Sequence, residues 1–330
     1  MPQVDEHEPV MVGEVVALFA PVPAGLVVDA TAGRGGHAAA LLTQHAHLRV
    51  LCLDRDPEAV RATAQRLSSF GERAVVRHAR FDRFFDEVDL VGEGAGDLSG
   101  VFFDLGVSSP QLDNPMRGFS YRHDGPLDMR MDPTGGPTAA EVVNEWDEET
   151  LARLFAANGE GRFARRIAHS LTKARPVSST VELAEIIRAA IPAAARRHGG
   201  HPARRVFQAL RIAVNEELEV LMQTLPEAIA ALAPGGRCVT LAYHSGEDRL
   251  IKSAFAEAAS GGCNCPPGLP CTCGASPLGR LVFRGARRPT PAEVATNRRA
   301  ESARLRAFER SSDEAGEASG GAGSNKADGV

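Results

Sequence analysis

The chain has 330 residues, of which 43% are apolar and 24% are charged, a composition typical of a globular protein and not of a disordered or fibrous one. No apolar run approaches the roughly 20 residues of a membrane-spanning helix, and the first residues lack the basic start and apolar run of a secretion signal. Two of the six cysteines, Cys52 and Cys238, lie inside apolar runs, which fits a reducing compartment better than a disulfide framework. We therefore expect a cytoplasmic protein that does not bind membranes.

The net charge of −5 is unevenly distributed along the chain. Residues 151–211 carry 11 Arg and one Lys against 3 Glu, and residues 279–310 carry 9 Arg against 3 Glu. Two such basic segments can follow a phosphate backbone through counterion release. Solvated helix faces explain the same charges equally well, so charge alone leaves nucleic-acid binding open.

Five short apolar runs, each bounded by turn residues, predict buried parallel strands at 26–31, 49–54, 74–79, 100–106 and 236–243. Helical patterns lie between them, and after the second run Asp56 and Pro57 supply an N-cap and a first-turn signal. Strands alternating with helices predict a doubly wound α/β sheet.

More than a hundred residues separate the fourth and fifth predicted strands, and they carry helical patterns at 149–158, 162–175, 179–191 and 201–225. In the last pattern an apolar stripe recurs at helical period, formed by Phe207, Leu210, Val214, Leu218 and Leu221. We predict a core of residues 1–112 and 213–310, a helical insertion of residues 113–212 suited to RNA recognition, and a disordered tail over 311–330.

A glycine-rich turn follows the first predicted strand, where Gly33, Gly35 and Ala38 match the pattern of a dinucleotide site. Asp54, at the end of the next strand, can accept hydrogen bonds from a ribose. Asp29 opposes a pyrophosphate, because it places a fixed negative charge at the carboxyl end of the strand. S-adenosylmethionine has an ammonium and a sulfonium for carboxylates to face, so the turn favours this methyl donor over a phosphate ligand.

The stretch DLGVSSPQLD begins at Asp104, at the end of the fourth predicted strand, on the sheet edge that faces a ligand crevice in open α/β sheets. Asp104 is expected to point at the reacting end of the cofactor, while Ser108 and Ser109 form a turn with exposed polar groups. His244 follows the fifth strand on the same edge and can approach a substrate, although the sequence favours a loop histidine held by main-chain hydrogen bonds.

Eight motifs carry a resemblance to a known family: HEPVMVGEVV from His7, DATAGRGGH from Asp29, LDRDPEA from Leu53, DLGVSSPQLD from Asp104, RGFSYRHDGPLDMRMD from Arg117, VFQALRIAVNEEL from Val206, LAPGGR from Leu232 and YHSGEDRLIK from Tyr243. In these motifs the chain resembles the bacterial 16S ribosomal RNA cytosine-N4 methyltransferases, the RsmH (formerly MraW) family. The resemblance extends from His7 to about Arg310.

The resemblance implies a class I, Rossmann-like methyltransferase sheet with an inserted helical domain. It also implies transfer of a methyl group from S-adenosylmethionine to N4 of a decoding-centre cytidine of 16S rRNA, in the small ribosomal subunit. At the positions that match the family motifs, the resemblance implies cofactor contacts by Gly35, Gly36, His37, Asp54, Phe81, Asp104 and Gln111. Asp29 and Gly33 are further cofactor-binding candidates, from the sequence of the glycine-rich turn.

Methylation of an amine conjugated with a base needs acceptors for its hydrogens as positive charge develops. Asp104 and the main-chain carbonyls of the turn from Leu105 to Ser109 are the candidates, with Ser109 and His244 as further catalytic candidates. The target cytosine must be unstacked, so we expect single-stranded or opened rRNA, stacked on Phe119 or Tyr121.

Four thiols lie close together in CNCPPGLPCTC, at Cys263, Cys265, Cys271 and Cys273. Their spacing is tighter than the usual pairs of zinc ligands, so the pattern favours a Pro-Gly loop with reduced cysteines and no metal, with zinc as the alternative.

Two other functions stay open at this point, an NAD(P)-dependent oxidoreductase and a non-catalytic RNA-binding protein. The sequence also leaves open whether the protein is a monomer or a homodimer.

Overall fold

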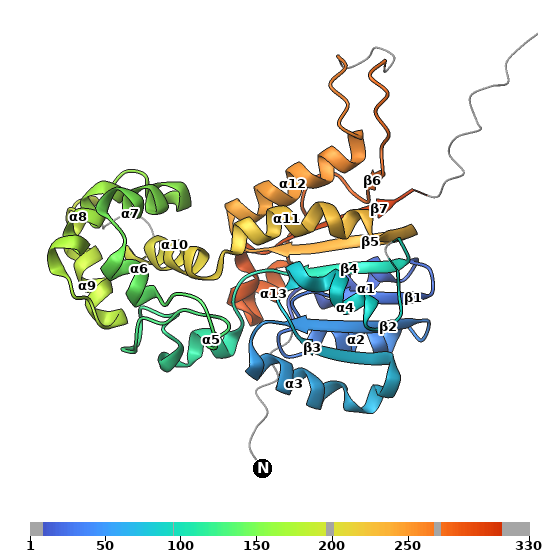
Figure 1. Ribbon diagram of the computed structural model, residues 1–330, viewed down its shortest axis with the longest axis horizontal. Coiled ribbons are helices and arrows are strands. Elements are labelled where there is room, and N and C mark those ends of the chain that lie inside the picture. Colours follow the sequence, from blue (N-terminus) through green and yellow to red (C-terminus); the bar gives the residue numbers. More distant parts are fainter. Residues whose placement is uncertain (1–8, 95, 196–200, 267–271, 312–330) are drawn as a thin grey trace, which may run out of the picture.

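The computed structural model describes residues 9–94, 96–195, 201–266 and 272–311. It contains a seven-stranded sheet with the order β3-β2-β1-β4-β5-β7-β6 (Figure 1). The strands are β1 Gly25–Asp29, β2 Leu48–Asp54, β3 Ala74–His78, β4 Leu98–Asp104, β5 Leu232–Ala242, β6 Gly279–Leu281 and β7 Arg304–Arg310. The first five are parallel and confirm the five predicted strands. The predicted tail lies outside the described residues beyond Ser311.

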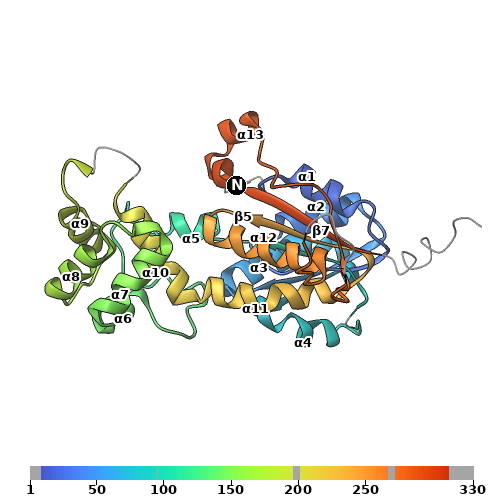
Figure 2. The same ribbon diagram turned by 90° about the horizontal axis from the view of Figure 1, so that it is seen from above.

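Alternation along the strands sends side chains to two faces, each covered by helices. Leu26 and Val28 of β1 pack with α4, α11 and α12, whereas Val27 packs with α1 and α2. Figure 2 shows α1 and α2 on one side of the sheet and α4 and α11 on the other. The helices of this part are α1 Val12–Phe19, α2 Gly36–Gln44, α3 Pro57–Leu67, α4 Phe84–Asp89, α5 Ser109–Asp113, α11 Glu217–Ala230, α12 Ser245–Ser260 and α13 Pro291–Thr296.

The segment between β4 and α11 folds into helices that surround an apolar core of their own (Figure 1). These helices are α6 Ala139–Glu145, α7 Glu148–Phe155, α8 Ala164–Ala174, α9 Thr180–Ala190 and α10 Ala203–Asn215. Side chains such as Phe155, Ile167, Ile187 and Leu210 are fully buried in this core. Phe119 is also buried there, so the prediction that it stacks on a base is wrong.

The helical pattern at 201–225 is not one helix as predicted, because Glu216 breaks it in the left-handed conformation with φ 53° and ψ 34°. Phe207, Leu210 and Val214 therefore pack in the insertion core, while Leu221 packs against the sheet. The apolar period continues across the break, so periodicity alone gave no sign of it.

The second basic segment contributes β6 and β7, which the sequence did not predict. Several of its arginines are neutralised within the fold: Arg304 and Arg306 each donate to Asp248, at 2.7 and 2.8 Å, and Arg280 donates to Glu309 at 2.6 Å. These three arginines are therefore not free surface charges, whereas Arg284, Arg287 and Arg288 of the same segment are exposed. Among the described residues, no helix is both long enough and apolar enough to cross a membrane.

Candidate active site

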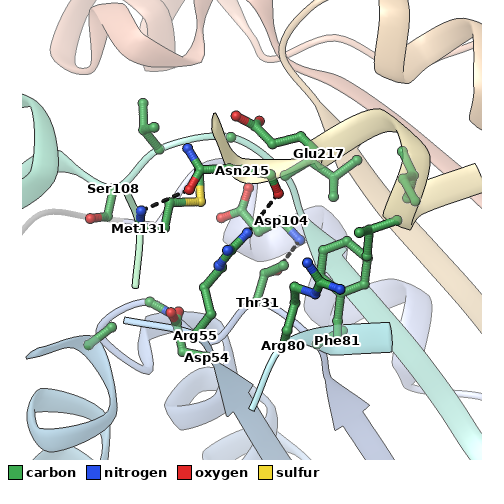
Figure 3. Close-up of a pocket in the computed structure, with 18 of the residues that line it drawn as sticks. Thr31, Asp54, Arg55, Arg80, Phe81, Asp104, Ser108, Met131, Asn215 and Glu217 are labelled. Atoms are coloured by element: carbon green, nitrogen blue, oxygen red, sulfur yellow. Dashed lines mark hydrogen bonds between the residues drawn. The ribbon is translucent and has the colours of Figure 1, made fainter. Parts of the chain in front are cut away.

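A pocket enclosing about 970 Å³ of space, including its open mouth, lies at the carboxyl ends of the parallel strands. The loop after β4 and the junction between α10 and α11 complete its wall (Figure 3). Its lining residues are Ala30, Thr31, Gly33, Asp54, Arg55, Ala59, Ala79, Arg80, Phe81, Asp104, Leu105, Gly106, Val107, Ser108, Gln111, Met131, Asn215, Glu217, Val220, Leu221, Tyr243 and Glu247.

The glycine turn presents Gly33 to this pocket, and the Gly33 main-chain N–H donates to Asp54 Oδ2 at 2.8 Å. A carboxylate thus occupies the amide that a pyrophosphate would need. Gly35 and Gly36 do not line the pocket and serve packing instead. A Cβ on Gly35 would lie 3.0 Å from Thr63 Cγ2, and one on Gly36 would lie 2.5 Å from Pro9 Cγ.

Three carboxylates converge behind and along the pocket wall, from the ends of β1, β2 and β4. Burial, against a hydrogen bond from Thr31 and with a smaller contribution from the charges of Asp104 and Asp54, raises the pKa of Asp29 to about 8. Burial also raises the pKa of Asp54 to about 6 and that of Asp104 above its usual range. Ionised carboxylates so desolvated need a positive partner, and a cationic ligand supplies one.

Asp104 is held in a fixed position by three neighbours. The Tyr243 hydroxyl donates to Asp104 Oδ1 at 2.7 Å, His37 Nδ1 lies 3.5 Å from Asp104 Oδ2, and the Asp104 main-chain N–H donates to Thr31 Oγ1 at 2.6 Å. Figure 3 shows Thr31 beneath Asp104. The Asp104 side chain is still 26% exposed, so it can accept a hydrogen bond from a ligand. His37 itself is buried and hydrogen-bonds to the Val10 carbonyl, so it reaches the pocket only through Asp104.

Phe81 and Gln111 both line the pocket, in different ways. The Phe81 ring contacts Phe103 edge to face, with 5.6 Å between ring centroids, and leaves an apolar surface suited to an adenine. Gln111 Nε2 donates to Asp56 at 2.9 Å and its Oε1 accepts from the Ser108 main-chain N–H at 3.0 Å. Because both ends of this amide are engaged, Gln111 holds the loop after β4 in place.

Ser109 and His244 do not line the pocket. Ser109 begins α5, and its neighbour Ser108 takes the lining position. His244 is the N-cap of α12, where its Nδ1 accepts from the Gly246 main-chain N–H at 3.1 Å, and its Nε2 lies 3.1 Å from Glu247 Oε1. The structure thus agrees with the interpretation of His244 as a histidine held by the main chain.

Sequence reasoning missed several residues of the site, chiefly Tyr243, Thr31 and Asn215. Tyr243 directly precedes His244, and the motif YHSGEDRLIK that begins with it at the end of β5 could have revealed it. Asn215 and Glu217 flank the helix break, which no pattern revealed. Glu217 accepts from Arg211 Nε at 2.8 Å, so Arg211 of the basic insertion serves this wall and is not a free surface charge.

The strand order with a reversed seventh strand, and the carboxylate-lined pocket without a phosphate cradle, agree with the class I S-adenosylmethionine-dependent methyltransferase that the sequence motifs imply. The model of the MraW methylase family matches residues 5–311, and the chain belongs to this family. The enzyme therefore uses S-adenosylmethionine, and the oxidoreductase and non-catalytic alternatives are set aside.

Close relatives span nearly the whole chain. The chain is 49% identical over 306 residues to the ribosomal RNA small subunit methyltransferase H of Symbiobacterium thermophilum, covering 91% of this chain and 95% of that protein. It is 50% identical over 311 residues to the protein of that name from Acidothermus cellulolyticus, covering 92% and 93%. A solved structure of an rRNA methylase from Streptococcus thermophilus is more distant, at 12% identity and a TM-score of 0.40 over 91% of this chain and 95% of that one.

Proposed function

We propose that this enzyme methylates N4 of a cytidine in the decoding centre of 16S rRNA, at position 1402. The observation that carries the substrate class is the half-identity, over nine-tenths of both chains, to methyltransferases named for the RNA of the small ribosomal subunit. The N4 atom and the position are what the resemblance in the sequence motifs implies. The most direct structural support is Asp104, a hydrogen-bond acceptor at the carboxyl end of β4. Part of its carboxylate is open to the pocket.

S-adenosylmethionine supplies a methyl group on a positively charged sulfur. The N4 amine of cytosine is a weak nucleophile because its lone pair is conjugated with the ring. An acceptor that draws on an N4 hydrogen stabilises the positive charge that develops during attack. Tyr243 donates to Asp104 Oδ1, and His37 lies 3.5 Å from Asp104 Oδ2. The acceptors in this proposal are the second lone pair of Asp104 Oδ2 and the carbonyls of the following turn. Asp29 and Asp54 are assigned to the charge and the ribose of the cofactor.

The helical insertion, residues 113–212, is proposed to bind the RNA. Arg162, Arg165 and Arg166 are exposed, as expected for contacts with phosphates. Elsewhere in the insertion, a groove is lined by Tyr121, Arg122, His201 and Arg204, and the rings of Tyr121 and His201 stack with 4.4 Å between centroids. Aromatic faces beside guanidinium groups are typical of single-stranded RNA sites.

The test is transfer of a labelled methyl group to 30S subunits that lack the modification, with mass spectrometry to locate the modified nucleotide. We expect incorporation at N4 of one cytidine. Asp104→Asn should lose turnover, while Asp113→Asn, an exposed carboxylate outside the pocket, should keep it. Methylation of another atom or another RNA would contradict the substrate assignment, and normal turnover of Asp104→Asn would remove Asp104 from the mechanism.

A further inference from the structure

Three cysteines meet in the segment that connects α12 to β6, away from the pocket. Cys263 and Cys265 follow the end of α12, and Cys273 lies on the returning arm, which projects above α12 in Figure 1. Their sulfur atoms all lie within 4.8 Å of one another. Cys271, the fourth thiol of the run, lies outside the described residues.

These distances match a metal site. Tetrahedral zinc binds thiolates at about 2.3 Å, which places any two of its sulfur ligands roughly 3.8 Å apart. Sulfur atoms within 4.8 Å of one another therefore reach this geometry by small side-chain rotations. Soft thiolate donors in a tetrahedral arrangement select zinc over magnesium or calcium.

Main-chain groups on the returning arm contact Cys265. The main-chain N–H of Thr272 and that of Cys273 both hydrogen-bond to the Cys265 sulfur. Main-chain amides that donate to sulfur orient it, as groups behind metal ligands do.

The outer part of the segment is not fixed by a hydrophobic core among its described residues. Its base is tied to α12, where the Leu278 main-chain N–H donates to the Ala258 carbonyl at 2.9 Å and that of Cys263 donates to Ser260 at 3.2 Å. Beyond the base, no described residue of 262–266 or 272–278 is buried. A chain segment without a hydrophobic core needs a cross-link to hold one conformation.

We propose that Cys263, Cys265 and Cys273 bind a zinc ion as thiolates, with one position left for a fourth donor. The ion joins the two arms of the segment and plays no part in methyl transfer. None of the three cysteines lines the active-site pocket. This inference is independent of the proposed RNA substrate.

The experiment measures metal in the full-length enzyme, purified without a metal-affinity tag or chelator, by inductively coupled plasma mass spectrometry. We expect about one zinc per chain, retained on gel filtration, and its loss in a variant with Cys263→Ser, Cys265→Ser and Cys273→Ser. The matched control is Cys238→Ala, a buried thiol of β5 that should leave the zinc content unchanged. Cobalt added to the metal-free enzyme should give the visible bands of tetrahedral thiolate coordination.

Binding of S-adenosylmethionine by the triple variant shows that its core is folded. A zinc content near zero in the unmodified enzyme, zinc lost on gel filtration, or zinc retained by the triple variant would each overturn the proposal. Thiol titration of the denatured enzyme adds a further check, because a disulfide in place of the zinc site would leave two thiols fewer than the sequence contains.

Discussion

Acidification should weaken cofactor binding in proportion to the protonation of Asp54. This carboxylate accepts from the main-chain N–H groups of Gly33 and Asp56, both at 2.8 Å, and it lines the pocket where a ribose is expected. With a pKa of about 6, it is roughly nine-tenths ionised at pH 7 and roughly one-tenth ionised at pH 5. If only the ionised form binds S-adenosylmethionine, the apparent Kd rises about tenfold across this interval, or about 1.4 kcal/mol.

The same protonation affects stability in the opposite direction. The pKa of Asp54 is raised from 3.8 to about 6 in the folded enzyme, so the native state binds more protons than the unfolded chain between these values. Stability contributed by this group therefore rises as the pH falls through that window. Loss of affinity between pH 7 and pH 5 is thus separable from unfolding.

Isothermal titration calorimetry at several pH values measures the effect, with a thermal melt at each pH to confirm that the enzyme is folded. Asp54→Asn removes the titrating group and should bind weakly at every pH with a flatter pH dependence. Asp113→Asn should retain the dependence of the unmodified enzyme. A Kd that changes less than about twofold between pH 7 and pH 5, or an equal slope in Asp54→Asn, would refute the reasoning.

Three further substitutions test the site. In the unmodified enzyme the Tyr243 hydroxyl donates to Asp104 and lowers the pKa of that carboxyl. Tyr243→Phe removes this hydrogen bond, so the pKa of Asp104 should rise and the acidic limb of the pH–rate profile should move to higher pH. An unmoved limb would exclude this coupling. Asn215→Leu leaves the Met131 main-chain N–H and the Met129 carbonyl without their hydrogen-bond partner. The free energy of unfolding in denaturant should fall by about 3 kcal/mol. A decrease of less than about 1 kcal/mol would show that these two hydrogen bonds contribute little to stability. Gly106→Ala places a Cβ 3.4 Å from the Tyr243 ring at a φ of 106°, next to the pocket. Turnover should therefore fall clearly while the denaturant midpoint of unfolding changes little. A large loss of stability with normal turnover would contradict this expectation.

The parallel strands were predictable because each is a short run buried on both faces. Val27, Val50 and Phe102 carry this signal in their own sequence. Strand β7 carries no such signal, since Arg304 and Arg306 alternate with its apolar residues. Both arginines are partnered by Asp248, more than fifty residues earlier, and such pairing cannot be found by a local pattern.

The acidic side of the site was also predictable, because the topology brings the ends of β1, β2 and β4 to one edge. Asp54 and Asp104 line the pocket there, and Asp29 is buried behind it. Which neighbours face the pocket was not predictable. Tyr243 and His244 are adjacent in the sequence, but only Tyr243 lines the pocket. His244 instead caps the helix that begins at Ser245, and the sequence did not show where this helix begins.

The break at Glu216 explains how an insertion far along the chain becomes part of the pocket. Arg55 donates to the Asn215 carbonyl at 2.8 Å, and Arg80 donates to Glu216 at 2.6 Å (Figure 3 shows both arginines). These arginines directly follow Asp54 and precede Phe81, the residues assigned to the ribose and the adenine. Because the same two turns hold the junction and line the pocket, the cofactor site is complete only when the insertion is docked on the sheet.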